Sequence, residues 1–243
     1  MSDSLVIIPT YNEKENIEDI IRYVFNLPDP FHLLIVEDNS PDGTADIVRK
    51  LQDEFGSDKL HMLCRKGKLG LGTAYLAGFK FALDRDYQYV FEMDADFSHN
   101  PNDLIRLKKA CSEGNGDMAI GSRYVSGVNV VNWPMIRVLI SYGASMYVQF
   151  LTGLPIKDPT AGFKCYSRRV LEKLANHKIK FVGYAFQIEM KFTTWKYGFN
   201  IVEVPIIFTD RTKGQSKMST KIIKEAILGV IQLKIKSLFT KYI

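Results

Sequence analysis

Short apolar runs alternate with segments of helical spacing through the first half of the chain. The runs occupy residues 5–9, 32–36, 60–64 and 89–93, and the helical segments occupy 15–27, 44–55, 73–83 and 101–113. Apolar runs separated by helix-length segments are typical of strands buried on both faces, joined into a parallel sheet by right-handed crossovers. We therefore expect an α/β fold with a mostly parallel sheet flanked by helices, whose strand ends line one crevice. Thr44 is the expected N-cap of the second helix.

The composition indicates a folded globular protein. With 243 residues, of which 46% are hydrophobic, the chain can bury a large core, and global disorder is excluded. The apolar run begins almost at the first residue, so we expect no secretory leader. Cys64, Cys111 and Cys165 are widely spaced and form no Cys-x-x-Cys pair, which argues against a zinc site or a disulfide framework. We interpret them as small buried side chains of a protein in the reducing cytoplasm.

The positive charge is concentrated at the C-terminal end. Residues 211–243 contain eight Lys or Arg and one acidic residue, a net charge of +7, whereas the whole chain carries +5. The first 210 residues are therefore slightly acidic, at −2. This distribution predicts an anionic partner at the C-terminal end and does not indicate general nucleic-acid binding.

Two carboxylates, Asp94 and Asp96, directly follow the apolar run at 89–93. In open α/β sheets, ligands bind at the carboxyl ends of the strands, where these side chains would project. Carboxylate oxygens are hard ligands that suit Mg²⁺ or Mn²⁺. We expect them to bind such an ion, which can hold a diphosphate.

Two further strand ends carry polar groups. Residues 9–13 leave the first strand with an aromatic ring and a carboxylate, which can stack on or hydrogen-bond to a base or ribose. Residues 36–40 end the second strand with Glu37 and Asp38, which suit the ring N–H groups of a nucleobase or ribose hydroxyls. An ordinary turn and solvated loop acids are the alternatives.

The glycine-bearing segment 67–73 matches neither the dinucleotide-binding G-x-G-x-x-G pattern nor a P-loop. A tight turn before the following helix and a supporting contact to a phosphate both remain open.

The sequence resembles the dolichyl-phosphate (polyprenyl-phosphate) mannose synthases, within the inverting glycosyltransferase family 2. The likeness covers residues 5–218, and five segments resemble the family's motifs in order, at 7–13, 37–44, 93–101, 121–124 and 158–163. The resemblance implies the Rossmann-like GT-A fold and transfer of mannose from GDP-mannose to a polyprenyl (dolichyl-type) monophosphate.

The resemblance also implies a donor site and a metal site. The nucleotide sugar would be bound by the following residues: Pro9, Tyr11, Glu13, Val36, Asp38, Asp94, Ala95, Asp96, Arg211 and Lys217. Arg211 and Lys217 match the family's mobile loop, which closes over the donor diphosphate. Asp94, Asp96 and Ser98 would hold Mg²⁺ or Mn²⁺, with Asp96 as the direct ligand.

On the acceptor side, the resemblance implies that Arg123, Arg137 and Ser141 bind the lipid phosphate. Arg137 and Ser141 are four residues apart on a helix expected to start near Pro134, so they share one face. Arginine forks match phosphate oxygens bidentately. The residues expected to act in catalysis are Asp96, Arg123, Arg137 and Arg211.

The chemistry expected of such a site needs no general base. A lipid monophosphate is already ionised near neutral pH, since its second pKa is about 6 by analogy with phosphorylated side chains. Positioning of that phosphate and charge stabilisation of the leaving diphosphate are then the main requirements. Attack from the face opposite the diphosphate would invert the anomeric centre.

The C-terminal residues indicate contact with a membrane surface. Residues 219–243 carry an apolar stripe bordered by lysines, typical of an interfacial amphipathic helix, so we divide the chain into a catalytic domain, 1–218, and a helical extension, 219–243. The uncharged stretch 138–155 is diluted by polar residues and predicts a buried or surface-lying helix rather than a membrane span. We expect a cytoplasmic protein bound peripherally to the membrane, and a membrane-embedded partner subunit is conceivable.

Two alternatives remain open. One is a family 2 transferase that uses UDP-glucose or another UDP-sugar, or a soluble sugar acceptor. The other is a catalytically silent nucleotide-sugar binding protein or membrane scaffold, which the presence of Asp94, Asp96, Arg123 and Arg137 argues against.

Overall fold

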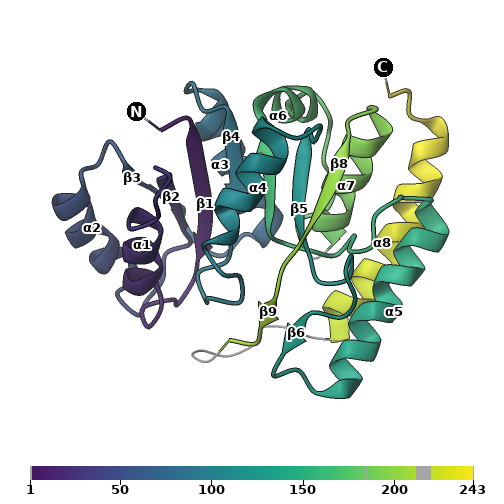
Figure 1. Cartoon of the computed structure of the whole chain (residues 1–243), viewed down its shortest axis with the longest axis horizontal. Helices are drawn as coiled ribbons and strands as arrows, with labels where there is room; N and C mark the ends of the chain where they lie inside the picture. The colour runs from purple at the N-terminus through teal and green to yellow at the C-terminus, as the bar shows by residue number, and fades with distance from the viewer. Residues whose placement is uncertain (1, 184, 212–219, 243) are drawn as a thin grey trace.

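A seven-stranded sheet with helices on both faces forms the body of the protein (Figure 1). The computed structural model describes residues 2–183, 185–211 and 220–242. The strands are β1 Ser4–Thr10, β2 His32–Glu37, β3 Leu60–Cys64, β4 Tyr89–Glu92, β5 Met118–Ser122, β6 Val130–Val131, β7 Lys164–Ser167, β8 Ile201–Pro205 and β9 Phe208–Thr209. The helices are α1 Ile17–Phe25, α2 Thr44–Phe55, α3 Leu71–Leu83, α4 Asp103–Ser112, α5 Met135–Thr152, α6 Arg168–Ala175, α7 Ala185–Lys196 and α8 Thr220–Phe239.

The strand order is β3-β2-β1-β4-β7-β5-β8, and β6 and β9 form a separate two-stranded sheet. In the large sheet all neighbours are parallel except β7, which is antiparallel to both β4 and β5. The mostly parallel α/β fold predicted from the sequence is therefore confirmed.

Both faces of the sheet are covered, which explains the continuous apolar runs in β1 and β2. Along β1, Leu5 and Ile7 pack in one core with α3, α6 and α7, while Val6 and Ile8 pack in the other with α1, α2 and α4. Consecutive strand side chains point to opposite faces, so a strand covered on both sides needs apolar residues at every position.

The order of the strands determines where the crevice of the sheet lies. Successive crossovers run outward from β1 to β2 and β3, and the chain then returns to β4 on the other side of β1. Such a reversal opens a crevice at the carboxyl ends of the two central strands, here after Thr10 of β1 and after Glu92 of β4.

The expected capping role of Thr44 was wrong. Gly43 is the N-cap, at φ 90°, and Thr44 is the first residue of α2. Glycine takes this left-handed conformation without steric cost, which lets the turn close one residue earlier. The Thr44 hydroxyl instead donates to Asp42 Oδ1 (2.6 Å) and accepts from the backbone N–H of Glu13 (3.1 Å), so it ties α2 to the loop after β1.

Helices α5 and α8 pack against each other at one end of the molecule (Figure 1). On α5 only Ser145, Val148 and Thr152 are buried, which confirms a surface-lying helix. The large apolar side chains that these two helices expose are Met135, Ile136, Leu139, Ile140, Tyr142, Met146 and Phe150 of α5 and Ile227, Leu228, Ile231, Ile235, Leu238 and Phe239 of α8. Within the described residues, neither these helices nor the others are long and apolar enough to cross a membrane.

Candidate active site

Asp96 lies at the base of the crevice, four residues after the end of β4, and is buried. It accepts hydrogen bonds from the backbone N–H (3.0 Å) and the hydroxyl (2.6 Å) of Ser98. Phe97 between them has a left-handed φ of 57°, which folds the chain back sharply enough for both bonds. Arg211 NH2 lies 2.9 Å from Asp96 Oδ2, so a cation already contacts this carboxylate.

Asp94 is the carboxyl group whose ionised form is disfavoured in this crevice. Its burial, together with the negative charge of Asp96, raises its pKa to about 7, and Glu13 and Glu92 add to the effect. Arg211 opposes the rise without cancelling it. Two carboxylates that repel each other in a low-dielectric crevice are stabilised by a cation placed between them.

The residues of this crevice suit a divalent cation that takes only some of its ligands from the protein. Among the described residues there is no group of three or more His, Cys, Asp or Glu side chains that could hold a metal ion. Mg²⁺ and Mn²⁺ in phosphate-binding sites take one or two carboxylates and complete their shells with phosphate oxygens and water. Asp94 and Asp96 match this pattern, and Ser98 as a further ligand stays a prediction.

On the nucleoside side, Asp38 is held by an arginine that the sequence reading missed. Arg65 Nε and NH2 donate to the two oxygens of Asp38, at 2.5 and 2.7 Å, and NH1 donates to Thr73 Oγ1 at 2.7 Å. Arg65 directly follows β3, so its position after a strand was the available signal. A carboxylate fixed in this way keeps further lone pairs for the N–H groups of a base.

The other predicted nucleoside contacts lie around Asp38 with differing exposure. Tyr11 and Pro9 are half-buried at the end of β1, and Lys68 Nζ lies 5.2 Å from the centre of the Tyr11 ring. Val36 and Ala95 are buried, so a ligand would meet their backbone rather than their side chains.

Glu37 does not face the crevice. Its two carboxylate oxygens accept from the backbone N–H groups of Asn39 (2.8 Å) and Ser40 (2.7 Å). The side chain is buried and holds its own loop, which leaves Asp38 as the acid that can face a base.

The glycine segment is explained by close packing. Gly72 N–H donates to the carbonyl of Val182 (2.8 Å), and a Cβ at Gly72 would lie 2.8 Å from the ring of Phe186. Such an approach of α3 to α7 is possible only without a side chain. The packing supports the tight-turn interpretation, and a phosphate contact by this segment stays a prediction.

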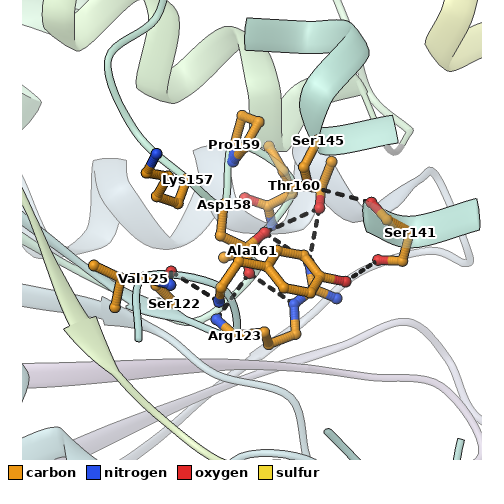
Figure 2. A network of polar contacts seen from close by, with 12 residues as sticks. Ser122, Arg123, Val125, Ser141, Ser145, Lys157, Asp158, Pro159, Thr160 and Ala161 are labelled. Carbon is orange, nitrogen blue, oxygen red and sulfur yellow. Dashed lines mark hydrogen bonds and ion pairs between the residues drawn. The ribbon is translucent and has the colours of Figure 1, made fainter. Parts of the chain in front are cut away.

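Arg123, at the end of β5, forms a buried ion pair (Figure 2). Its Nε and NH2 each donate to an oxygen of Asp158 at 2.7 Å, and NH2 also donates to Thr160 Oγ1 at 2.7 Å. The two charged side chains are 6% and 0% exposed. Burial alone would raise the pKa of Asp158, but the charge and hydrogen bonds of Arg123 outweigh it and hold that pKa below its usual value.

Arg137 and Ser141 share the inner face of α5, as predicted. Arg137 NH1 lies 2.6 Å from Asp210 Oδ2, and its guanidinium lies 4.1 Å from the centre of the Trp133 ring. Ser141 Oγ accepts a hydrogen bond from the hydroxyl of Tyr124 (2.7 Å), the residue after Arg123 (Figure 2).

The chain around β9 joins the two sides of the crevice. Asp210 contacts Arg137, and the next residue, Arg211, contacts Asp96. The backbone N–H of Thr209 also donates to the carbonyl of Ser98 (3.1 Å). The structure therefore brings the predicted donor and acceptor residues together, with Asp210 as a link that the sequence reading missed. Lys217 lies outside the described residues.

A buried polar network surrounds Glu92, two residues before Asp94. Glu92 is ion-paired with Lys164 (2.9 Å) and accepts hydrogen bonds from Tyr166 (2.7 Å) and Gln187 (2.8 Å). Glu189 accepts from the backbone N–H groups of two residues in the loop before α7. Gln187 and Glu189 are thus engaged inside the protein.

Comparison with known proteins gives a family and two curated relatives. The family model "Glycosyl transferase family 2" matches residues 5–175. A polyprenol monophosphomannose synthase of Mycolicibacterium smegmatis is 47% identical over 236 residues, which are 96% of this chain and 87% of the relative. An undecaprenyl-phosphate mannosyltransferase of Micrococcus luteus is 43% identical over 226 residues, 93% of this chain and 91% of the relative.

A solved structure shares the fold. A mannosyltransferase from Pyrobaculum calidifontis, in complex with GDP-Man and Mn²⁺, superimposes with a TM-score of 0.59 over 98% of this chain and 74% of that chain. At 15% sequence identity this similarity shows the fold alone.

Proposed function

Because the chain belongs to glycosyltransferase family 2, we propose that its crevice transfers mannose from GDP-mannose to a polyprenyl monophosphate and inverts the anomeric centre. The names of the two curated relatives support this substrate pair. The observation that carries the proposal is the meeting of an acidic pair, Asp94 and Asp96, with three arginines in one crevice. Acids suit a metal-bound diphosphate, and arginines suit a phosphate nucleophile.

On the donor side, Asp94 and Asp96 would hold a divalent cation, with Ser98 beside them. Bound there, Mg²⁺ or Mn²⁺ would supply positive charge for the diphosphate as it leaves. Arg211, which now contacts Asp96, can add its own charge to the same oxygens. Tyr11, Asp38 and the residues around them would orient the nucleoside.

On the acceptor side, the phosphate is its own nucleophile, and the protein has to orient it. Arg137 and Ser141 present a guanidinium and a hydroxyl from one face of α5, and Arg123 lies at the end of β5 beside them. Fixing a charged nucleophile against the sugar lowers the entropic part of the barrier. No proton has to be removed, because the phosphate is ionised at neutral pH, with a second pKa of about 6.

The exposed face of α5 and α8 supports a peripheral position on the membrane. Met135, Ile136, Leu139 and Ile140 are exposed within the first two turns of α5, next to Arg137 and Ser141. A lipid whose phosphate is bound by these two residues would have its chain beside apolar side chains. Helix α8 extends the same apolar surface, and the basic C-terminal end suits anionic headgroups.

Membrane attachment through this face is testable by itself. Phe150, 87% exposed on α5, should enter the lipid. Phe150→Ser should reduce sedimentation with vesicles that contain anionic phospholipid, while Tyr23→Ser, at an exposed ring of α1, should not. Equal sedimentation of all three proteins would contradict the proposal. The helical extension 219–243 as a separate domain, and a membrane-anchoring partner, stay predictions.

The function is tested by a screen of donors against acceptors. Labelled GDP-mannose and UDP-glucose are each incubated with polyprenyl phosphate and with soluble sugars, with and without EDTA. We expect label from GDP-mannose in the lipid fraction, and its loss with EDTA. Label from UDP-glucose, or label only in a soluble saccharide, would favour the alternative transferase, and donor binding without any transfer would favour a silent binding protein.

A further inference from the structure

Lys191, on α7, is completely buried and has no role in the reaction as described above. Its ammonium donates hydrogen bonds to the backbone carbonyls of Pro159 (3.0 Å), Ala161 (2.6 Å) and Gln187 (3.0 Å). Three carbonyl acceptors require three N–H donors, which lysine has only in its charged form. The three carbonyls therefore favour the charged form of Lys191 and oppose the effect of its burial, which lowers its pKa well below the usual value.

The two carbonyls outside α7 belong to residues 157–161, here called the Asp158 loop. A second charged side chain contacts this loop: Glu203, on β8, accepts from the backbone N–H groups of Lys157 (2.7 Å) and Asp158 (3.0 Å). An anion therefore holds the N–H groups at the start of the loop, and a cation holds the carbonyls at its end.

The Asp158 loop is also the part of the protein that holds Arg123. Asp158 and Thr160 make three hydrogen bonds to its guanidinium, and Asp158 makes one more to its backbone N–H (3.0 Å) (Figure 2). Because all four bonds come from the same few residues, a displacement of the loop would turn or release the guanidinium.

Stability alone is a weak reason for this arrangement. Buried charges are costly to desolvate, and well-packed apolar side chains often stabilise a fold equally well or better. Charges at both ends of one short loop instead fix its position within the narrow distance range that hydrogen bonds allow.

We propose that Lys191 and Glu203 are positioning residues for the acceptor: they fix the Asp158 loop, and the loop fixes Arg123 toward the lipid phosphate. The inference rests on the proposed function, because it takes Arg123 to bind that phosphate. It adds two residues, one each from α7 and β8, which act through the loop without touching either substrate.

The test is the effect of Lys191→Met on the two substrates separately. Methionine has a similar length and no charge, so Pro159 and Ala161 lose their partner. We expect the KM for polyprenyl phosphate to rise about tenfold, while the KM for GDP-mannose stays within about twofold. Calorimetry with GDP and Mn²⁺ should give the Lys191→Met variant the same affinity as the unchanged protein. An unchanged acceptor KM, or equal rises for both substrates, would overturn the inference.

Two further variants keep the test valid if Lys191→Met does not fold. Thr160→Val removes one acceptor of Arg123, and Glu203→Gln removes the charge at the start of the loop. Each should raise the acceptor KM and spare the donor KM. If every variant that folds leaves the acceptor KM unchanged, the inference is wrong.

Thr194→Val is the matched control. Thr194 is buried on the same helix as Lys191, and its hydroxyl donates to the carbonyl of Met190 (2.8 Å), within the helix itself. Its acceptor KM should stay as in the unchanged protein, and a rise equal to that of Lys191→Met would assign the effect to α7 as a whole. If the unchanged protein transfers nothing to polyprenyl phosphate, the proposed function itself fails, which is a different result from an unaltered KM in the variants.

Discussion

Two acidic positions on opposite sides of the crevice are balanced in different ways. Both oxygens of Asp158 accept from Arg123, and its pKa lies below the usual value. Asp94 has a pKa raised to about 7 by burial and by Asp96, which Arg211 offsets only in part. The protein completes the first site with its own cation. It leaves the second with excess negative charge, which supports the proposal that an added ion binds there.

The largest effect is expected where the site is complete. Asp158→Ala leaves the guanidinium of Arg123 buried without its partner, and removing one member of a buried pair typically costs about 3–5 kcal/mol of unfolding free energy. Denaturant unfolding measures this. Asp46→Ala is the control, because Asp46 and its partner Arg49 are both exposed, and such a pair contributes about 1 kcal/mol or less. Similar losses in the two variants would contradict the comparison.

At the incomplete site, substitution should affect turnover more than stability. Asp96→Ala removes one of two repelling carboxylates, which offsets part of the cost of losing its bonds to Ser98, so the free energy of unfolding should fall by less than in Asp158→Ala. Transfer of mannose should fall by about 10²–10³-fold, the usual cost of losing one charge-stabilising group. Initial rates and denaturant unfolding are measured on the same preparation. A variant that unfolds as readily as Asp158→Ala would show that Asp96 is structural.

The opposite pKa shifts of Asp94 and Asp158 also predict opposite effects of pH on their contributions to folding stability. The pKa of Asp94 is raised on folding, so its contribution to stability is greatest at low pH and is lost as pH rises toward about 7. The pKa of Asp158 is lowered, so its contribution is present above the unfolded-state value and is lost on acidification.

Binding of Mn²⁺ without nucleotide tests the Asp94 side of this contrast. Because Asp94 must lose its proton to bind a cation, affinity should increase by up to about tenfold per pH unit below 7 and level off above it. Titrations at several pH values measure this, and Asp94→Asn should flatten the dependence. An affinity independent of pH between 5 and 7 would remove Asp94 from the metal site.

The sequence predicted the incomplete site better than the complete one. The strand before Asp94 and Asp96 is recognisable from its apolar run Tyr89–Phe91, and residues that follow such a strand are expected at the crevice. The Arg123–Asp158 pair joins residues 35 positions apart. Asp158 lies in the loop before β7, an antiparallel neighbour of β5 whose four residues carry no distinguishing pattern. Lys191 and Glu203 were missed for a related reason: a charged residue in a helix or strand is interpreted as solvent-exposed unless its buried partner is known.

The smallest effect on stability is expected at Arg211, which contacts Asp96. Arg211 is 27% exposed, so its loss should lower the unfolding free energy less than the loss of Asp158, whose pair is buried on both sides. It should nevertheless strengthen Mn²⁺ binding in the absence of nucleotide, by about two- to fivefold, because a cation that competes for the same carboxylate is removed.

Arg211→Gln tests this against Arg137→Gln, in which the lost ion pair is with Asp210 and not with Asp96. Only the first substitution should increase Mn²⁺ affinity, although both should slow transfer. The combination of tighter ion binding and slower turnover would separate the two tasks of Arg211, balancing Asp96 in the free protein and the diphosphate in the reaction. Equal Mn²⁺ affinities in the two variants would mean that the guanidinium does not occupy the position of the ion, and the contrast between a complete and an incomplete site would then rest on Asp94 alone.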